Sequence, residues 1–351
     1  LTGSMRIGGN GGECVTIRDN KSTPGTLSLK RNYGDDARSE VLIDGGGNIY
    51  VASCTQSPDF PTTTGCVQKT FGGKQDGVVI KLNQNCNTVL WSTYLGGTED
   101  DAAYVLALGN NNNLYVGGGT ASNDITSISS SGVISPANSG GPCDGYVVEL
   151  TNDGSTAVRG TYLGTSQADQ IYGIQTDKSG NVYVMGTTEG AWTVLNASTF
   201  GPESSKQFIS KILPDPSGDI YFNLFVSGYP LPNFFPNSFF VDRCENVYVS
   251  GWGCKADYKL GFNNSTTRGM PVTADAIKGV TDASGSDFYF IVIKKDAASL
   301  LYGTYFGQDD PVGDVPQTFG DHVDGGTSRF DQNGVIYQAM CSNCLKTVNF
   351  F

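Results

Sequence analysis

The stretch that decides the fold runs from residue 76 to residue 118. It contains four short apolar segments: DGVVIKLN at residues 76–83, WSTYLGG at 91–97, YVLAL at 104–108 and NLYVGG at 113–118. Each segment has the length of a strand and is rich in β-branched and aromatic residues. Turn residues such as Asn and Gly separate the segments. The stretch therefore predicts a small antiparallel sheet whose hairpin turns use Gly or Asn at positive φ.

The Asn-x-Tyr strand of this stretch recurs along the chain. The apolar residue before each tyrosine is Ile49, Leu114, Val182, Val247 and Ile336, so successive copies lie 65, 68, 65 and 89 residues apart. Copies of the first segment read CVTIR at residues 14–18, YVVEL at 146–150, FISKI at 208–212 and FYFIVI at 288–293. Repeated units of four antiparallel strands predict an all-β fold, a β-propeller. A sandwich would not repeat the same order of strands at this period, and a parallel β-helix has shorter coils.

The repeats predict how the blades divide the chain. We expect a single propeller domain over residues 1–351, with five blades near 13–55, 76–122, 144–190, 206–254 and 286–341. Long loops such as residues 55–75 would then lie between blades. Residues 1–4 resemble the end of a strand, so we expect the chain to be a fragment of a larger protein. The five blades would form a closed ring or be part of a ring of six or seven blades.

Composition restricts the partners. The net charge is -12, and the 22 basic residues are spread along the chain without forming a stripe. Nucleic acid is therefore not an expected partner, because phosphate binding needs clustered Lys and Arg. No apolar run approaches the roughly 18 residues of a membrane span. A weakly charged, acidic chain rich in Asn, Thr, Ser and Gly is typical of secreted or cell-surface proteins.

The repeats resemble a known family. The segments quoted above, with DFPTT at residues 59–63 and FGG at 71–73, are similar to the bacterial β-propeller repeats called SBBP repeats. The segments DRCENVYVSGWG at 242–253 and GDHVDGG at 320–326 resemble large surface proteins of Bacteroidetes-type bacteria. Those proteins leave the cell by the type 9 secretion system and carry gliding-motility-associated modules. The resemblance implies export to the outer-membrane-associated exterior of a bacterium. It implies no catalytic activity, because the family has no transferable catalytic motif.

The nine cysteines are an odd number for a secreted chain. Cys54 and Cys66 flank a turn-rich loop, so they are candidates for a small disulfide loop. Cys341 and Cys344 form a CxxC pair, for which we expect disulfide pairing with each other or with residues beyond position 351. A zinc site would need a second such pair or a His pair, and the chain has one histidine, His322.

Repeated acidic residues precede one strand of each unit. Asp36, Asp101 and Asp169 occupy the same repeat position. Catalytic residues should occur once in a chain, whereas these recur with each blade. We therefore favour a structural role in which each carboxylate accepts backbone N–H bonds in a tight turn. The alternative is a structural calcium ion held by these oxygens; no other cofactor is expected.

Aromatic residues beside irregular loops are the candidate ligand-binding residues. They are Trp192, Tyr229, Phe234, Phe235 and Trp252. Rings on loops can stack on sugars or anchor a protein partner. Trp252 lies in an apolar strand, and packing between blades is its alternative role. His322, between Asp321 and Asp324, is a further candidate for binding.

These observations favour a non-enzymatic surface module for binding or adhesion. Its expected partners are other surface proteins or extracellular glycans, and its loops would make the contacts. One alternative is a glycosidase or lyase with carboxylates at the propeller funnel, for which Glu99, Glu149, Glu189 and Glu203 are candidates. The other is a structural subunit of a surface filament or of a secretion or gliding assembly, in which copies of the chain associate.

Overall fold

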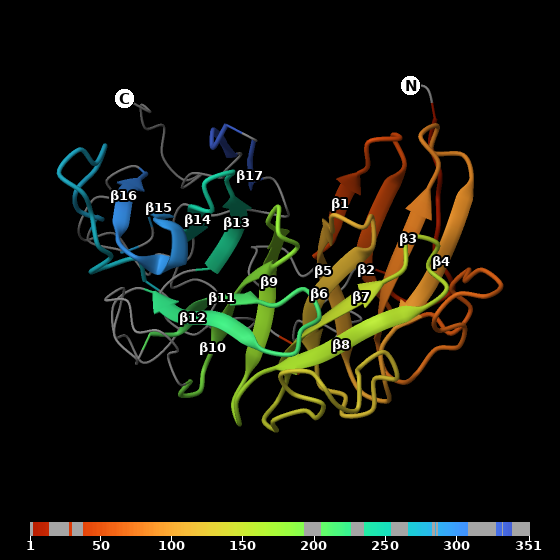
Figure 1. Ribbon diagram of the computed structural model, residues 1–351. Coiled ribbons are helices and arrows are strands. Elements are labelled where there is room, and N and C mark those ends of the chain that lie inside the picture. The colour runs from red at the N-terminus through yellow and green to blue at the C-terminus, as the bar shows by residue number, and fades with distance from the viewer. Residues whose placement is uncertain are drawn as a thin grey trace, which may run out of the picture.

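The computed structural model describes residues 3–13, 28–29, 38–192, 205–225, 235–253, 266–282, 285, 287–307, 328–331 and 333–338. In these residues four antiparallel sheets of four strands follow one another along the chain, and a two-stranded sheet comes last (Figure 1). The first sheet contains β1 (Glu40–Ile43), β2 (Ile49–Thr55), β3 (Asp76–Leu82) and β4 (Val89–Leu95). The second contains β5 (Asp101–Leu108), β6 (Leu114–Thr120), β7 (Asp144–Leu150) and β8 (Ala157–Leu163).

The third sheet contains β9 (Asp169–Thr176), β10 (Val182–Thr188), β11 (Gln207–Ile212) and β12 (Asp219–Phe225). The fourth contains β13 (Phe235–Val241), β14 (Val247–Trp252), β15 (Phe288–Ile293) and β16 (Leu300–Phe306). The last sheet pairs β17 (Ser328–Phe330) with β18 (Ile336–Gln338). A short 3₁₀ helix, η1 (Lys295–Ala297), joins β15 to β16. No helix among the described residues is long and apolar enough to cross a membrane.

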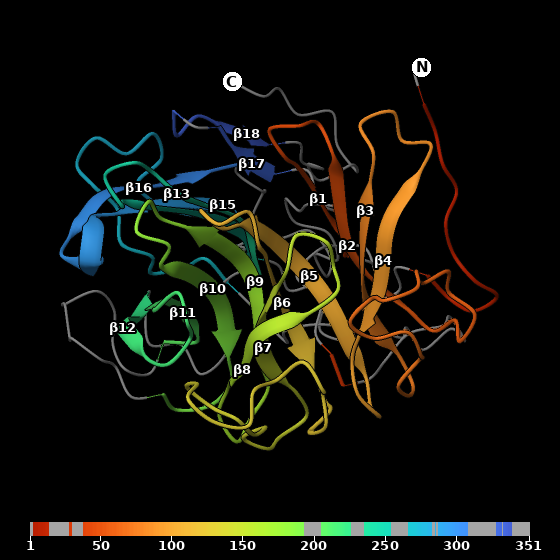
Figure 2. The same ribbon diagram turned by 45° about the vertical axis from the view of Figure 1, so that its right-hand side comes forward.

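The sheets are the blades of a propeller, which confirms the predicted fold class. In Figures 1 and 2 the β1–β4 sheet lies on one side and the β13–β16 sheet on the other, with the second and third sheets between them. Side chains of β1, β5, β9, β13 and β17, the first strand of each sheet, line one common cavity. The first strands therefore lie nearest the axis, and the last strands lie at the outer edges.

The predicted blade boundaries, 13–55, 76–122, 144–190, 206–254 and 286–341, are wrong in phase. β2 pairs with β3 over its whole length, from Ile49 opposite Leu82 to Thr55 opposite Asp76. The long loop of residues 56–75 therefore lies inside one blade. The crossing between blades is instead the five-residue link of residues 96–100, which leads from β4 to β5. The same arrangement recurs at residues 164–168, between β8 and β9.

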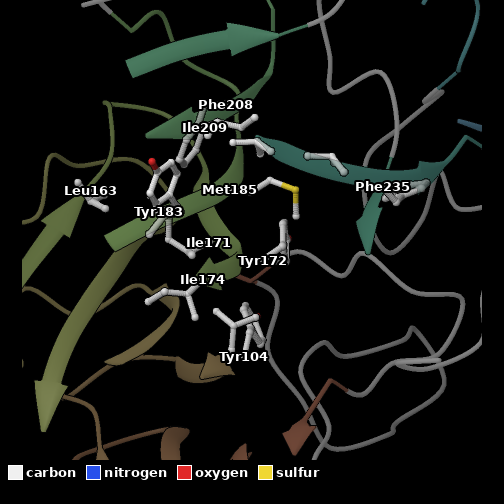
Figure 3. Packing of buried hydrophobic residues seen from close by; sticks show 14 of the residues in the cluster. Tyr104, Leu163, Ile171, Tyr172, Ile174, Tyr183, Met185, Phe208, Ile209 and Phe235 are labelled. Atoms are coloured by element: carbon white, nitrogen blue, oxygen red, sulfur yellow. The ribbon is translucent and has the colours of Figure 1, made fainter. Parts of the chain in front are cut away.

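The third strand is buried on both faces in each of the first two blades. Every residue of β3 and of β7 is buried, whereas β4 and β8 begin with half-buried or exposed positions. Between the second and third blades, Tyr104 stacks on Tyr172 with ring centroids 5.7 Å apart. Figure 3 shows these two rings near Ile171 and Met185 in the same apolar cluster. Burial of aromatic and branched side chains between sheets, at roughly 25 cal/mol per Å² of apolar surface, is the main stabilising contribution.

A repeated Asp closes the hairpin between the first two strands of four of the five described sheets; in the β5–β6 turn Asn111 accepts the N–H of Asn113 instead. Oδ1 of Asp44 accepts the N–H groups of Gly46 and Asn48 at 2.9 and 2.8 Å. Asp177, Asp242 and Asp331 accept N–H groups in the same pattern. Gly47 takes a φ of 81°, as a tight hairpin turn requires. These segments are hairpin turns, as their spacing predicts.

The predicted disulfide between Cys54 and Cys66 is not formed, because Cys66 is a free thiol. Cys54 lies in β2 and belongs to the buried apolar core, where its exposure is 1%. Cys66 lies on the 56–75 loop beside Val67, whose N–H bonds to the carbonyl of Gly154 in the next blade. The two thiols therefore belong to different surroundings. Cys341 and Cys344 lie outside the described residues.

A buried tyrosine in the last strand of a blade anchors the long loop. The hydroxyl of Tyr305 donates to the carbonyl of Thr267 at 2.8 Å and accepts the N–H of Met270 at 2.9 Å. Tyr94 does the same for the 56–75 loop, since its hydroxyl donates to Ser57 and accepts from Phe60. These hydroxyls satisfy backbone groups that water cannot reach.

Replacing this anchor should therefore destabilise the protein. Tyr305→Phe leaves the buried N–H of Met270 without its acceptor, and we expect the free energy of unfolding to fall by about 1–3 kcal/mol. Denaturant unfolding measures the change. Tyr337→Phe is the matched control, because Tyr337 is 60% exposed. Equal effects of the two substitutions would contradict the anchoring role.

Candidate functional site

A polar cleft opens where the long loops of the first two blades meet. Its cavity volume is about 350 Å³, and we call it the interblade cleft. The lining residues come from three segments and are Val67, Gln68, Lys69, Thr70, Gly72, Gly96, Gly97, Thr98, Asp124 and Thr126. The exposed groups are three threonine hydroxyls, one ammonium and one carboxylate. Such a surface offers many hydrogen-bond donors and acceptors and close access to glycine backbone.

The link between the blades forms one wall of the cleft and is held by side chains of the next blade. Oδ1 of Asp124 accepts the N–H of Thr98 at 3.0 Å, and Oγ of Ser122 accepts the N–H of Glu99 at 2.9 Å. A side chain at Gly97 would place its Cβ 2.2 Å from the Asp124 carboxylate, so only glycine fits there. The cleft is therefore built on a fixed backbone.

Two buried carboxyl groups lie beneath the cleft. Oδ2 of Asp76 accepts the N–H of Gly72 at 2.8 Å and the side-chain amide of Gln68 at 3.0 Å. Oδ2 of Asp101 accepts the N–H of Gly97 at 2.7 Å and the hydroxyl of Ser122 at 2.8 Å. Three of these donors, Gln68, Gly72 and Gly97, line the cleft. The shape of the cleft thus depends on both carboxyl groups.

Burial controls the protonation of these acids. It raises the pKa of Asp76 to about 7 and the pKa of Asp101 to about 8, although hydrogen bonds to both carboxyl groups act in the opposite direction. At the next blade interface burial raises the pKa of Asp144 to about 7 and that of Asp169 to about 6. Burial is the largest cause of the raised pKa at all four positions, so it controls the protonation of the acids at both interfaces.

A second, smaller cavity of about 80 Å³ lies on the axis. Arg38 is buried beside it, donates to the carbonyl of Tyr172 at 2.7 Å and lies over the rings of Tyr104 and Tyr172. Glu40 accepts the N–H of Leu106 at 3.3 Å and pairs with Arg329 of β17 at 3.4 Å. Burial raises the pKa of Glu40, and the charges of Arg329 and Arg38 oppose that rise. The pair joins the last described sheet to the first.

An apolar groove of about 540 Å³ lies between the fourth sheet and the β17–β18 sheet. Phe290, Tyr302, Phe306, Phe330 and Ile336 contribute to its lining. Ile277 lies at the same groove and is 75% exposed. Contiguous exposed apolar surface of this kind is typical of interaction sites.

The predicted aromatic residues that the structure describes lie in the core or pack against it. The binding prediction is wrong for Phe235, and Trp252 takes its alternative role of packing; each is 1% exposed, and their ring centroids are 4.6 Å apart. They are opposite each other at the ends of β13 and β14, so strand pairing turns both rings into the core. Trp192 is half-buried and packs on Phe208 at 4.9 Å. Tyr229, Phe234 and His322 lie outside the described residues.

The acids predicted from the repeat act as turn acceptors. Asp101 accepts from Gly97, and Asp169 accepts the N–H of Thr165 at 2.6 Å. Asp36 lies outside the described residues. The described part of the chain holds no group of three or more His, Cys, Asp or Glu side chains that could bind a metal ion. The calcium alternative thus has no supporting geometry in that part.

The acids at the start of the third strand and the residues that line the interblade cleft and the axial cavity were not predicted from the sequence. Asp76 and Asp144 precede glycine in the repeated DGVV and DGYV segments, so their repetition was the available signal. Glu40 is a charged residue at the start of the apolar segment EVLI, which is the signal that the sequence offers. Asp124 follows the pattern Thr-x-Ser-x-Asp, which also occurs at residues 55–59.

Comparison with known proteins supports the repeat. Residues 159–191 match the family model described as SBBP, beta-propeller repeat. This match confirms the resemblance seen in the sequence, and it runs from within β8 through β10. No curated protein matches the chain.

Several solved structures are similar at low identity. A protein of unknown function from Dyadobacter fermentans has 11% identity and a TM-score of 0.37, covering 81% of this chain and 69% of its own. The mannose phosphorylase MPT-4 from Leishmania mexicana has 11% identity and a TM-score of 0.33, covering 78% and 69%. PorZ, a surface component of the type-IX secretion system of Porphyromonas gingivalis, has 16% identity and a TM-score of 0.26, covering 78% and 42%.

The contact between β17 and β1 can be tested at Arg329. Arg329→Met removes the ion pair with the partly buried Glu40, and we expect the free energy of unfolding at neutral pH to fall by about 1 kcal/mol. The loss should shrink in high salt, which screens the pair in the wild type. Lys74→Met is the control, since Lys74 and Glu99 form an exposed pair. An Arg329 variant as stable as the wild type would argue against the contact.

Proposed function

We propose that the protein is an exported, non-enzymatic surface propeller that binds an extracellular glycan through the interblade cleft. The observation that carries the proposal is the polar lining of the cleft, which combines threonine hydroxyls, the Lys69 ammonium and the Asp124 carboxylate on a fixed backbone. Sugars present rows of hydroxyl groups that such donors and acceptors can match. The resemblance to exported SBBP-repeat proteins supports a location on the cell surface.

A glycosidase has less support. Most glycoside hydrolases use two carboxyl groups on either side of the scissile bond. Among the described residues lining the axial cavity, Glu40 is the one carboxylic acid, and it pairs with Arg329. Glu99 pairs with exposed Lys74, whereas Glu149 accepts from Asn111 and Asn113 at the opposite end of the blade. Glu189 follows β10, and Glu203 lies outside the described residues.

Filling the cleft should weaken glycan binding. Thr126 is exposed and lines the cleft, so Thr126→Trp places a bulky ring where the ligand would lie. On an array of bacterial and host polysaccharides, we expect the variant to bind its glycan about tenfold more weakly than the wild type, a change of about 1.4 kcal/mol. Thr156→Trp is the matched control, because Thr156 is an exposed threonine in the turn at the far end of the same blade.

Three results would contradict this proposal. Equal binding by the Thr126 variant would place the ligand elsewhere. Release of reducing sugar from the bound glycan would show an enzyme. Binding to a surface protein, with no glycan on the array retained, would change the class of partner.

The apolar groove favours a second candidate function, that of a subunit in a surface assembly. Ile277 and the aromatic residues beside it would be covered if copies of the chain packed against one another. This function and glycan binding are not exclusive, because the groove and the cleft involve different blades.

Light scattering over a range of protein concentrations tests the assembly. We expect mass to increase with concentration in the wild type and to stay at that of a monomer in Ile277→Asp, because a carboxylate in the contact costs several kcal/mol. Leu90→Asp is the control, since Leu90 is 45% exposed on β4. A wild type that is monomeric at every concentration would reject the assembly role. So would an Ile277 variant that assembles normally.

A further inference from the structure

The interfaces between the first three blades each contain a pair of buried carboxyl groups. One member begins the third strand of a blade, and the other begins the first strand of the next blade. The pairs are Asp76 with Asp101 and Asp144 with Asp169, and the exposure of all four is 0%. The backbone N–H of Asp101 bonds to the carbonyl of Gln75 at 2.8 Å, and that of Asp169 bonds to the carbonyl of Cys143 at 2.9 Å. The same arrangement of two buried acids therefore occurs at both interfaces.

The two carboxyl groups of the first pair approach one point. A Cβ atom at Gly96 would lie 2.8 Å from Oδ1 of Asp76 and 2.8 Å from Oδ2 of Asp101. The two oxygens therefore lie within twice that distance of each other. Oδ1 of Asp76 is buried without a hydrogen-bond partner, and so is Oδ1 of Asp144 in the second pair. Two carboxylates this close in a dry interior cannot both carry a charge without a large cost.

The surroundings offer little to neutralise that charge. Asp124 and Tyr94 face Asp76, and Tyr146 and Tyr162 face Asp101. The nearby ammonium of Lys74 pairs with Glu99 at the surface. The second pair has Glu189 and Tyr162 as titratable neighbours, and the ammonium of nearby Lys206 donates to the carbonyls of Glu189 and Gly190. The named neighbours of both pairs are thus acids or phenols, apart from Lys74 and Lys206, whose ammonium groups already have other partners.

The fourth blade provides an internal comparison. Asp287 stands at the position of Asp76 and Asp144, and its carboxylate pairs with Lys278 at 3.0 Å. Where the repeat places one acid at this position with a lysine beside it, the lysine compensates the charge. Where it places a second acid instead, a proton is the simplest compensation.

We propose that each carboxyl pair holds a proton at neutral pH and that loss of the proton from the Asp76–Asp101 pair at alkaline pH loosens the loops forming the interblade cleft. The coupling is direct, because Asp76 holds Gln68 and Gly72 and Asp101 holds Gly97, and all three line the cleft. The predicted change in ligand affinity rests on the glycan-binding function proposed above. The predicted protonation of the pairs does not depend on that function.

The pKa values give the direction of the pH dependence. The folded-state pKa of each acid, about 6 to 8, lies above the ordinary value of 3.8, so the folded protein binds more protons than the unfolded chain between these values. The contribution of the pairs to stability is complete below about pH 4 and is lost as pH rises through 6 to 8.

The test is the melting temperature of the full chain at pH 5 and at pH 8 at constant ionic strength. We expect a lower melting temperature at pH 8 in the wild type and a smaller drop in Asp76→Asn and Asp144→Asn, whose amides mimic the protonated acid. Asp153→Asn is the control, because hydrogen bonds lower the pKa of exposed Asp153 to about 2, outside this range. A wild-type melting temperature that is constant or rises between the two values overturns the proposal. A drop in both Asn variants as large as that of the wild type does the same.

Two further measurements separate the competing explanations. If millimolar calcium chloride raises the melting temperature of the wild type at pH 8 but not that of Asp76→Asn, a cation rather than a proton compensates the pair. Affinity for the glycan found on the array should fall at pH 8 in the wild type and not in Asp76→Asn. A pH-dependent melting temperature without any glycan binding would reject the proposed function and leave the protonation intact. Glycan binding without a pH-dependent melting temperature would do the reverse.

Discussion

The short link from the outer strand of one blade to the inner strand of the next is the constraint on which the structure depends. Residues 96–100 must cross the depth of a blade, so their polar backbone enters the interface between two sheets. A buried N–H group needs an acceptor there, and Asp101 supplies one to Gly97. Asp169 does the same for Thr165. The acids are therefore consequences of the crossing, and they bring negative charge into the driest part of the molecule.

The sequence reveals the period of the repeat but not its phase. β4 and β5 are separated by five residues and belong to different sheets, whereas β2 and β3 are separated by a long loop and pair in full register. Proximity along the chain therefore groups β4 with β5, although these strands belong to different sheets. The family repeat at residues 159–191 also begins in one sheet and ends in the next. Each strand resembles its counterparts, so the strand count and the fold class were predictable, while the choice of hydrogen-bonded neighbours was not.

The candidate site was predictable only where a residue recurs. The turn-acceptor role of Asp101 and Asp169 followed from their repetition, and the structure confirms it. Phe235 was predicted to bind ligand because the proline-rich sequence before it resembles a loop, and its pairing with Trp252 shows that it faces the core. The cleft was not predictable from the sequence for a different reason. Thr70, Thr98 and Thr126 are ordinary residues in three separate segments, and the packing of two blades is what gathers them.

The blade interfaces are not equivalent in charge, although they are equivalent in backbone. The position of Asp76, six residues before the end of the third strand, holds Asp144, Lys206 and Asp287 in the next three blades. Lys206 brings no negative charge, and Asp287 pairs with Lys278. The first two interfaces instead combine an acid from each blade, and one of them carries the polar cleft directly above it. A rigid loop surface and a titratable interior thus come from the same few hydrogen bonds. The hydrogen bonds that fix the loops end on titratable carboxyl groups, so the position of the loops depends on the protonation of those groups.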